Sequence, residues 1–533
     1  MEATGAEPRN NGTLFATVAA AGIVQLPTAA IVVALPTIHG EFGTSIAELQ
    51  WTVTAFSIPF AAFLIAAGRL ADIFGRRRAL FIGCFLFALG SLLAAISPGI
   101  DVLIGGIALS GIGAALMMPA SMSILTNVFT GARRGTAIGM WGAATELVSG
   151  IGVLIGGVLT GQLDWRWIFV VCIVFSIAIV GVALKSSPES SDPNASRDVD
   201  FAGVALSASG LTAMTLALIQ GATWGWGSPA VVGLLAAAVL MFAAFFVIEK
   251  RSDHPIFDFA FFKSRNFLGA TIVIFALDFS FGALLFFLPL YFQEILDYSP
   301  TEVGALLLPL TGLMVIGSPL GGRVAAKVGP RPPIAIGLAA MAVAVWFLSE
   351  ISLSSDYASL WIPTAVMGFG VGFALTPMNL AAMNAVSRDH AGAASGMLVT
   401  LSGLGSTLGV AVTGAIFNNL NQDNTIEEVS KRIGKPISEG QAESLDGILA
   451  GSSGAKKTLE RIVGTDVEAT REAIRQAFVD SLGVSLKISA GLILMALVLT
   501  IVLMRKSSPV DAEPVPPVLG SVTPRPAPRM IDG

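Results

Sequence analysis

Apolar stretches of about 20 residues recur along the chain, and short segments that carry most of the charged residues separate them. A stretch of that length can cross the hydrocarbon core of a membrane as an α-helix. We predict fourteen such helices, at 14–38, 51–68, 79–97, 101–126, 136–160, 166–185, 201–221, 229–249, 267–293, 302–320, 333–352, 358–384, 392–418 and 479–504. The pattern therefore predicts an all-α integral membrane protein.

Composition agrees with this fold class and excludes several others. Of the 533 residues, 54% are hydrophobic and 13% are charged, and the mean hydropathy is +0.77. A net charge of -5 argues against a nucleic-acid partner, and a sequence without a phosphate-binding loop argues against ATP as the energy source. Cys84 and Cys172 lie in apolar stretches without metal-ligand spacing. We expect two buried thiols, no metal site, no cofactor and no enzymatic activity.

Basic residues predict the orientation. Alternate loops between the predicted helices carry clusters of arginine and lysine, whereas the short loops on the other side carry only Arg166. Cytoplasmic loops of membrane proteins are enriched in these residues. We therefore expect a multi-pass protein of the cytoplasmic membrane with both termini in the cytoplasm.

Four segments lie outside the predicted spans. Residues 1–13 form a short cytoplasmic N-terminus, and residues 186–200 form an acidic, serine-rich linker. The external segment 419–478 spaces its apolar residues as short amphipathic helices do, which predicts a helical cap; a gate or a docking site for a partner is the alternative. The proline-rich tail 507–533 is expected to be disordered.

A glycine- and arginine-rich motif, GRLADIFGRRR, occupies residues 68–78 between two predicted helices. Glycine lets two helices approach closely, an aspartate can meet a helix N-terminus or an arginine, and the arginines hold the loop in the cytoplasm. A weaker copy, GGRVAAKVGPR, occupies residues 321–331 and indicates a duplicated bundle. The candidate cytoplasmic gate consists of Gly68, Asp72, Gly75, Arg76 and Arg77.

Three further motifs accompany this loop: WRWIF at 165–169, GATWGWGS at 221–228, and a YxQ…YSP pattern at 291–300. Along nearly its whole length the chain resembles the fourteen-helix drug:proton antiporter branch of the major facilitator superfamily, the EmrB/QacA-like multidrug exporters. The resemblance implies export of amphipathic, often cationic, compounds in exchange for protons.

The resemblance also implies the domain layout. Two pseudo-symmetric six-helix bundles are expected at 14–185 and 267–504, with two inserted central helices at 201–249. The expected partners are a small amphipathic substrate, protons and membrane lipids, and the chain is expected to act as a monomer.

A run of glycines in the fifth predicted helix resembles the antiporter motif of that family. We expect these residues on one side of the helix, where a second helix can press against them and rock. They are Gly142, Gly150, Gly152, Gly156 and Gly157. The family has a proline where this chain has Val153, and its loss removes a kink. Ordinary close packing of helices is the alternative.

Three family positions, in the first and fourth predicted helices, are changed in this chain. The family's first helix carries an aspartate where Pro27 stands, and its fourth helix carries an arginine and a glutamine at Ile107 and Ser110. Because a buried arginine without its acid is costly, joint loss of the charged pair is physically coherent. The usual coupling residues of the family are therefore missing.

Two other acids replace them as candidates. Glu146 lies roughly 15 Å into the fifth helix and Asp278 roughly 16–18 Å into the ninth, so both are predicted near the middle of the membrane. Such a carboxylate can exchange a proton or meet a cationic substrate; the alternative is a protonated acid that only packs helices together. The candidate residues of the cavity wall are Gln25, Phe275, Gly282 and Asn379.

Three function classes remain at this stage. The motifs favour a proton-driven exporter of amphipathic drugs or toxic metabolites. The sparse polar lining and the lost charged pair favour the alternative, an exporter or flippase of a lipid or an endogenous metabolite. A non-transporting sensor or scaffold is the third, but it would need no acids in the membrane.

Overall fold

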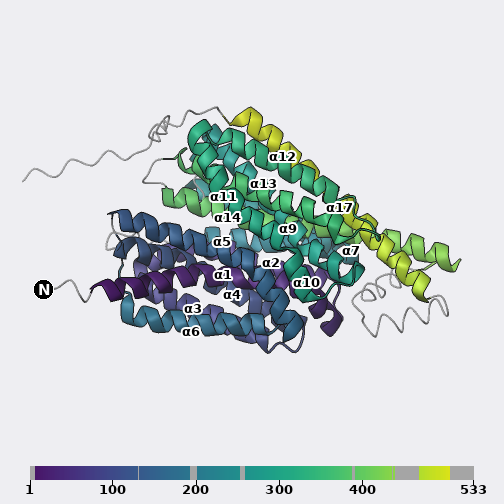
Figure 1. Ribbon diagram of the computed structural model, residues 1–533, viewed down its shortest axis with the longest axis horizontal. Coiled ribbons are helices and arrows are strands. Elements are labelled where there is room, and N and C mark those ends of the chain that lie inside the picture. The colour runs from purple at the N-terminus through teal and green to yellow at the C-terminus, as the bar shows by residue number, and fades with distance from the viewer. Residues whose placement is uncertain are drawn as a thin grey trace, which may run out of the picture.

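The computed structural model describes residues 6–129, 131–191, 201–251, 259–386, 391–434, 436–437 and 467–504 (Figure 1). All regular secondary structure in these ranges is helical. Twelve helices of the described chain are long and apolar enough to cross a membrane, and Ala205–Gly221 is a shorter apolar helix. The predicted all-α fold is confirmed.

The first six helices form one bundle, drawn in purple and blue in Figure 1. They are α1 (Ala6–Phe42), α2 (Ile46–Phe74), α3 (Arg76–Ala95), α4 (Ile100–Val128), α5 (Gly131–Gln162) and α6 (Trp167–Ser186). Glycines bring α3 and α4 into backbone contact at two levels. A Cβ built on Gly83 would lie 2.9 Å from the carbonyl oxygen of Gly113, and one on Gly106 would lie 2.7 Å from that of Gly90. Small residues at such crossings are typical of membrane helices.

The second bundle, drawn in green and yellow in Figure 1, packs its helices in the same pairs as the first bundle does. It consists of α9 (Arg265–Leu290), the π-helical turn η2 (Tyr291–Ile295), α10 (Pro300–Leu306), α11 (Leu308–Val328), α12 (Arg331–Leu348), α13 (Tyr357–Met383), α14 (Ala391–Ile433) and α17 (Val467–Leu503). The helix predicted at 302–320 lies within one candidate membrane span, Pro300–Val328, which is interrupted at Leu307. Pro309 lacks a backbone N–H and its ring clashes with the preceding turn, which separates α10 from α11.

Two helices, α7 (Phe201–Trp224) and α8 (Pro229–Arg251), are inserted in the sequence between the two bundles. They pack against each other. Helix α7 also contacts α2 and α14, one helix from each bundle. Ile219 of α7 is buried in a small apolar cluster with Ala47 and Ala411. The inserted pair therefore covers one seam where the two bundles meet. A short 3₁₀ helix, η1 (Phe259–Lys263), leads into α9.

Several predicted boundaries are wrong. Helix α1 begins at Ala6 and not at residue 14. Helix α14 continues to Ile433, and α17 already begins at Val467, so both extend into the predicted external cap. Figure 1 shows their ends projecting together beyond the other helices. The rest of the predicted cap, at 438–466, lies outside the described residues, as do 192–200 of the linker and the tail 507–533.

The loop motif is mostly helical, which corrects the prediction that it lies between two helices. Residues 68–74 complete α2, and only Gly75, with φ +108°, separates α2 from α3. In the second copy, Gly329, with φ +84°, separates α11 from α12 in the same way. Backbone with such positive φ favours glycine. The two motifs thus mark equivalent positions in two equivalent bundles.

Candidate functional site

A central cavity of about 390 Å³ lies between the two bundles. Helices α1, α2, α4 and α5 form one side, and α9, α11, α13 and α14, their counterparts in the second bundle, form the other. Cavities of roughly 300–1,000 Å³ hold drug-sized ligands. A site built from equivalent helices of two bundles can be exposed to either side of a membrane when the bundles rock.

The cavity wall is mainly apolar, with aromatic rings from Phe56, Phe60 and Phe281. Its polar side chains are mostly uncharged, and they are Gln25, Thr28, Ser57, Thr145, Ser149, Asp278, Thr311, Ser402 and Ser406. Asp278 is the one acidic or basic residue among the described residues of this wall. Aromatic faces beside a carboxylate suit an amphipathic cation.

Asp278 lies halfway along α9, where it meets α14. It is half-buried and stands thirteen residues after Arg265, which corresponds to about 20 Å of helix. A Cβ built on Gly405 of α14 would lie 3.3 Å from the Cβ of Asp278 and 2.7 Å from the carbonyl oxygen of Phe275. Glycine thus lets α14 approach the backbone of α9 directly beside the carboxylate.

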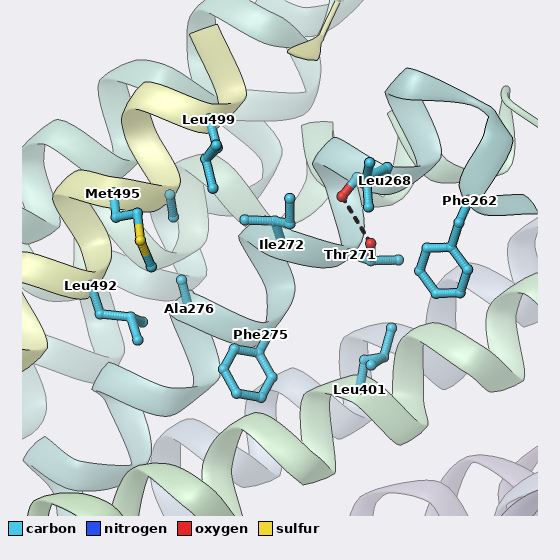
Figure 2. A pocket seen from close by; sticks show the side chains of 11 residues that line it. Phe262, Leu268, Thr271, Ile272, Phe275, Ala276, Leu401, Leu492, Met495 and Leu499 are labelled. Atoms are coloured by element: carbon cyan, nitrogen blue, oxygen red, sulfur yellow. Dashed lines mark hydrogen bonds between the residues drawn. The ribbon is translucent and has the colours of Figure 1, made fainter. Parts of the chain in front are cut away.

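The structure brings some of the predicted cavity residues together and separates others. Gln25, Asp278 and Gly282 lie on the wall of the central cavity. Phe275 instead lines a second, apolar pocket (Figure 2), although it is only three residues from Asp278. Asn379 is exposed, and its amide donates to the carbonyl oxygen of Leu375 at 3.1 Å. Placing Phe275 and Asn379 on the cavity wall was therefore wrong.

Glu146 belongs to α5, between two residues of the cavity wall, Thr145 and Ser149. Its side chain lies outside the part of the chain that the structure describes. The hydroxyls of Thr145 and Ser149 on α5, and of Ser402 and Ser406 on α14, stand at i and i+4 on their helices. This spacing places each pair on one face. It was present in the sequence and could have identified the wall.

The five glycines of α5 do not share one side, which corrects the predicted stripe. Two of them face α1. A Cβ on Gly152 would lie 2.8 Å from the Cβ of Ala29, and Gly156, one turn further along α5, packs against the backbone of Ala30. Gly150 and Gly157, seven residues apart, face α11 and α10 of the other bundle, whereas a Cβ built on Gly142 would meet nothing within 4 Å among the described residues. Helix α5 therefore uses glycine twice, once within its bundle and once between bundles.

Helix α2 packs on α14 between the bundles, and further contacts between the bundles lie at the ends of α1, α5 and α9 that are away from the loop motifs. The amide of Gln293 donates to the carbonyl oxygen of Val33 at 2.8 Å, and the hydroxyl of Thr301 donates to that of Gly157 at 3.1 Å. A Cβ on Gly157 would lie 2.5 Å from the carbonyl oxygen of Pro300. We call these two hydrogen bonds and the Gly157 contact the bundle latch. Most of its second-bundle side comes from the YxQ…YSP segment.

At the opposite end, the loop motif is held by a residue that the sequence did not single out. The backbone N–H of Arg77 donates to Glu189 at 3.0 Å, and its guanidinium donates to the carbonyl oxygen of Ser187 at 3.1 Å. The guanidinium groups of Arg77 and Arg78 also lie 3.9 and 3.8 Å from the Glu189 carboxylate. The segment after α6 thus clamps the start of α3.

The other gate residues are less constrained than expected. The backbone N–H of Arg76 donates to the carbonyl oxygen of Ser190 at 2.9 Å. Among the described residues, a Cβ on Gly68 would lie 3.6 Å from the Cβ of Pro119, which is an ordinary van der Waals contact. A Cβ on Gly75 would lie 2.7 Å from the Glu189 carboxylate. The side chain of Asp72 lies outside the described residues.

Two of the three changed family positions lie together. Pro27 of α1 and Ile107 of α4 line one small cavity of about 10 Å³, with Phe56 and Phe169 among its other walls. A cavity of this size is at the lower limit for a single water molecule. Ile107 is 3% exposed. The described lining of this space is uncharged, which agrees with joint loss of a charged pair.

Arg166, the single basic residue of the short loops predicted outside, has an acidic partner. The Arg166 guanidinium lies 2.7 Å from Glu41 at the end of α1, and Trp165 donates its indole N–H to the same carboxylate at 2.7 Å. Hydrogen bonding to Glu41 raises the pKa of Arg166, although partial burial works against it. Trp165 itself is 1% exposed. This cluster ties α6 to α1.

Two equivalent helical bundles around one cavity, with a carboxylate in its wall, define a membrane transporter. The chain belongs to the Major Facilitator Superfamily, whose family description matches residues 17–410, and the predicted membership is confirmed. The tetracenomycin C resistance and export protein of Streptomyces glaucescens is 27% identical over 96% of this chain and 95% of its own length. The puromycin resistance protein pur8 of Streptomyces alboniger is 33% identical over 77% of this chain and 82% of its own.

A solved structure shares the fold. A bacterial homologue of the human lysosomal transporter Spinster, in an inward-facing and unoccupied conformation, superposes with a TM-score of 0.62 and covers 93% of this chain and 98% of its own. The two chains are 18% identical, so this likeness concerns the fold alone.

Proposed function

We propose that this protein exports amphipathic, in part cationic, drugs or toxic metabolites across the cytoplasmic membrane in exchange for protons. The observation that carries the proposal is the central cavity, in which the Asp278 carboxylate lies among aromatic and hydroxyl side chains from both bundles. The names of the relatives that export or confer resistance to tetracenomycin C and puromycin support the substrate class.

Proton coupling follows if substrate and proton compete for one carboxylate. A cationic substrate that enters the cavity from the cytoplasm displaces the proton of Asp278, and a proton that enters from outside displaces the substrate. Glu146, on α5 next to the cavity wall, is the proposed second acid of the exchange. The substrate itself undergoes no covalent change.

Alternating access requires that the bundle latch close and open. In the conformation described here the latch is formed, and we interpret it as the state closed to the outside. Opening costs the hydrogen bonds of Gln293 and Thr301, and it separates Gly157 from Pro300. At the cytoplasmic end, Asp72 is proposed to pair across the bundles in the opposite state, while Glu189 holds Arg77.

The proposed orientation places both termini and the two loop motifs in the cytoplasm. It is supported by the basic residues of those loops and by the ion pair that neutralises Arg166 on the other side. Helices α14 and α17 then project outside the membrane. We further propose that the chain works as a monomer, because each single chain encloses a complete cavity.

The proposal is tested by uptake of ethidium into inverted vesicles that carry the purified protein and an imposed pH gradient. Wild type is expected to accumulate the dye only with the gradient, and Asp278→Asn and Glu146→Gln are expected to lose gradient-driven uptake. Asp480→Asn, at an exposed site on α17, is the control and should behave as wild type. Unchanged uptake in both cavity variants would exclude the proposed acids.

A second candidate function is export of a lipid or an endogenous metabolite without the usual coupling. The uncharged surroundings of Pro27 and Ile107 favour it, because the family's charged pair is absent there. Ethidium movement without any dependence on the pH gradient would shift the assignment to this class.

A further inference from the structure

A second pocket, of about 360 Å³, lies on the second bundle outside the central cavity (Figure 2). Side chains from α9, α14 and α17 line it, among them Phe275, Leu401, Met495 and Leu499. Thr271 contributes a hydroxyl, but this hydroxyl donates to the carbonyl oxygen of Leu268 in its own helix at 2.8 Å, as Figure 2 shows. The pocket thus offers an apolar surface and no uncommitted polar group among its described residues.

The pocket lies within segments long and apolar enough to span the membrane. Along α9 it extends from Leu268 to Ala276, which corresponds to about 12 Å of helix. Along α17 it lies in the last three turns before Leu503. Both stretches belong to the cytoplasmic half of the membrane in the orientation proposed above. At this depth the pocket is surrounded by the acyl chains of the inner leaflet and not by water.

Basic residues stand at the cytoplasmic end of the pocket. Phe262 lines it, the exposed Lys263 follows directly, and the exposed Arg265 begins α9 three residues before Leu268. Basic groups on the cytoplasmic side of gaps between membrane helices bind anionic lipid head groups. An apolar slot beneath two cations matches a phospholipid, with its tail in the slot and its phosphate at the rim.

The pocket is separated from the central cavity by the seam of α9 and α14. Gly405 packs on the backbone of Phe275, and Gly409 packs on that of Phe279, so no side chain separates the two helices. Leu401 faces the pocket, whereas Ser402 and Gly403 face the cavity. A molecule in the pocket therefore does not reach Asp278 unless this seam opens.

We propose that the pocket binds one acyl chain of an anionic phospholipid of the cytoplasmic leaflet, with the head group at Lys263 and Arg265. The bound chain fills the space beside Phe275 and supports the α9–α14 seam that carries Asp278. The proposal depends on the orientation of the chain and not on drug export.

The test uses the full-length protein in nanodiscs with phosphatidylglycerol that carries a photoreactive group in one acyl chain. Cross-linked peptides are mapped by mass spectrometry. We expect labelling at 268–276 and 492–499, its loss in Met495→Trp, which fills the mouth of the pocket, and its retention in Ile488→Trp. Met495 and Ile488 are 56% and 44% exposed on the same helix, so both variants should fold.

The head group is tested with Lys263→Gln and Arg265→Gln. Each substitution should weaken labelling by about fivefold, and photoreactive phosphatidylcholine should label less than phosphatidylglycerol. Equal labelling in Met495→Trp and Ile488→Trp would overturn the acyl-chain site. Equal labelling by both lipids would overturn the head-group assignment, and displacement of the lipid by ethidium would assign the pocket to the substrate instead.

Discussion

Gly157→Ala is expected to open the external side of the transporter. The added methyl group would lie 2.5 Å from the carbonyl oxygen of Pro300 and 3.0 Å from the Cα of Gly304. Both are backbone atoms, so α10 must move away from α5. Because this movement also stretches the hydrogen bond from Thr301 to Gly157, the closed state loses a polar contact as well.

The magnitude follows from overpacking. Forcing one extra methyl group into a well-packed contact costs about 1–3 kcal/mol. If this cost falls only on the closed state, the ratio of open to closed molecules rises about 5- to 150-fold, since each 1.4 kcal/mol is a factor of ten. Replacing a helical glycine by alanine also stabilises the helix itself by about 0.5–1 kcal/mol, in both states.

Gly142→Ala supplies the matched control, because a Cβ there meets nothing within 4 Å in the part of the chain that the structure describes. A cysteine introduced at Thr28, on the cavity wall, reports the opening through its reaction with a membrane-impermeant maleimide added outside intact cells. The native Cys84 and Cys172 are buried and give little background. We expect faster labelling with Gly157→Ala than with Gly142→Ala. Equal labelling rates would refute the bundle latch as the external closure.

Three further substitutions test other contacts. Glu189→Gln should weaken the contacts of Glu189 with Arg77 and Arg78 and lower the transport rate. Asp423→Asn, far from the motif, is the control and should leave the rate unchanged. An unchanged rate of Glu189→Gln at matched expression would show that transport does not depend on these contacts. Glu41→Ala should lower the melting temperature in detergent, because Trp165 and Arg166 lose an acceptor worth about 1–2 kcal/mol in this partly exposed cluster; an unchanged melting temperature would mean that water replaces the carboxylate. Ile107→Arg should abolish folded protein in detergent, since a cavity of about 10 Å³ cannot hold a guanidinium; a stable variant would show that α1 and α4 separate easily.

The helices themselves could be predicted because each needs only a long apolar stretch. Their ends could not. The polar residues that follow residue 418 look like a loop to a hydropathy argument, yet α14 continues to Ile433, since a helix outside the membrane needs no apolar sequence. Pro309 indicates the break at Leu307, but a hydropathy argument does not detect it, because the residues on both sides are apolar.

The candidate site was predictable only in part. Asp278 and Gln25 attract attention as polar residues in apolar helices, and both line the cavity. Phe275 was misplaced because the path of α14 decides which face of α9 meets the cavity, and a single helix does not contain that information. The same holds for Glu189, whose role depends on where the segment after α6 returns to the loop motif.

Proton release on substrate binding tests the proposed exchange most directly. Purified protein in weakly buffered detergent solution near neutral pH is mixed with ethidium, while bound dye and released protons are recorded together. If Asp278 and Glu146 exchange protons for substrate, wild type releases protons in proportion to the dye bound, and the Glu146→Gln, Asp278→Asn variant releases none at equal occupancy. Dye binding by wild type without proton release, or the same release from the double variant, would contradict proton-coupled export through these acids.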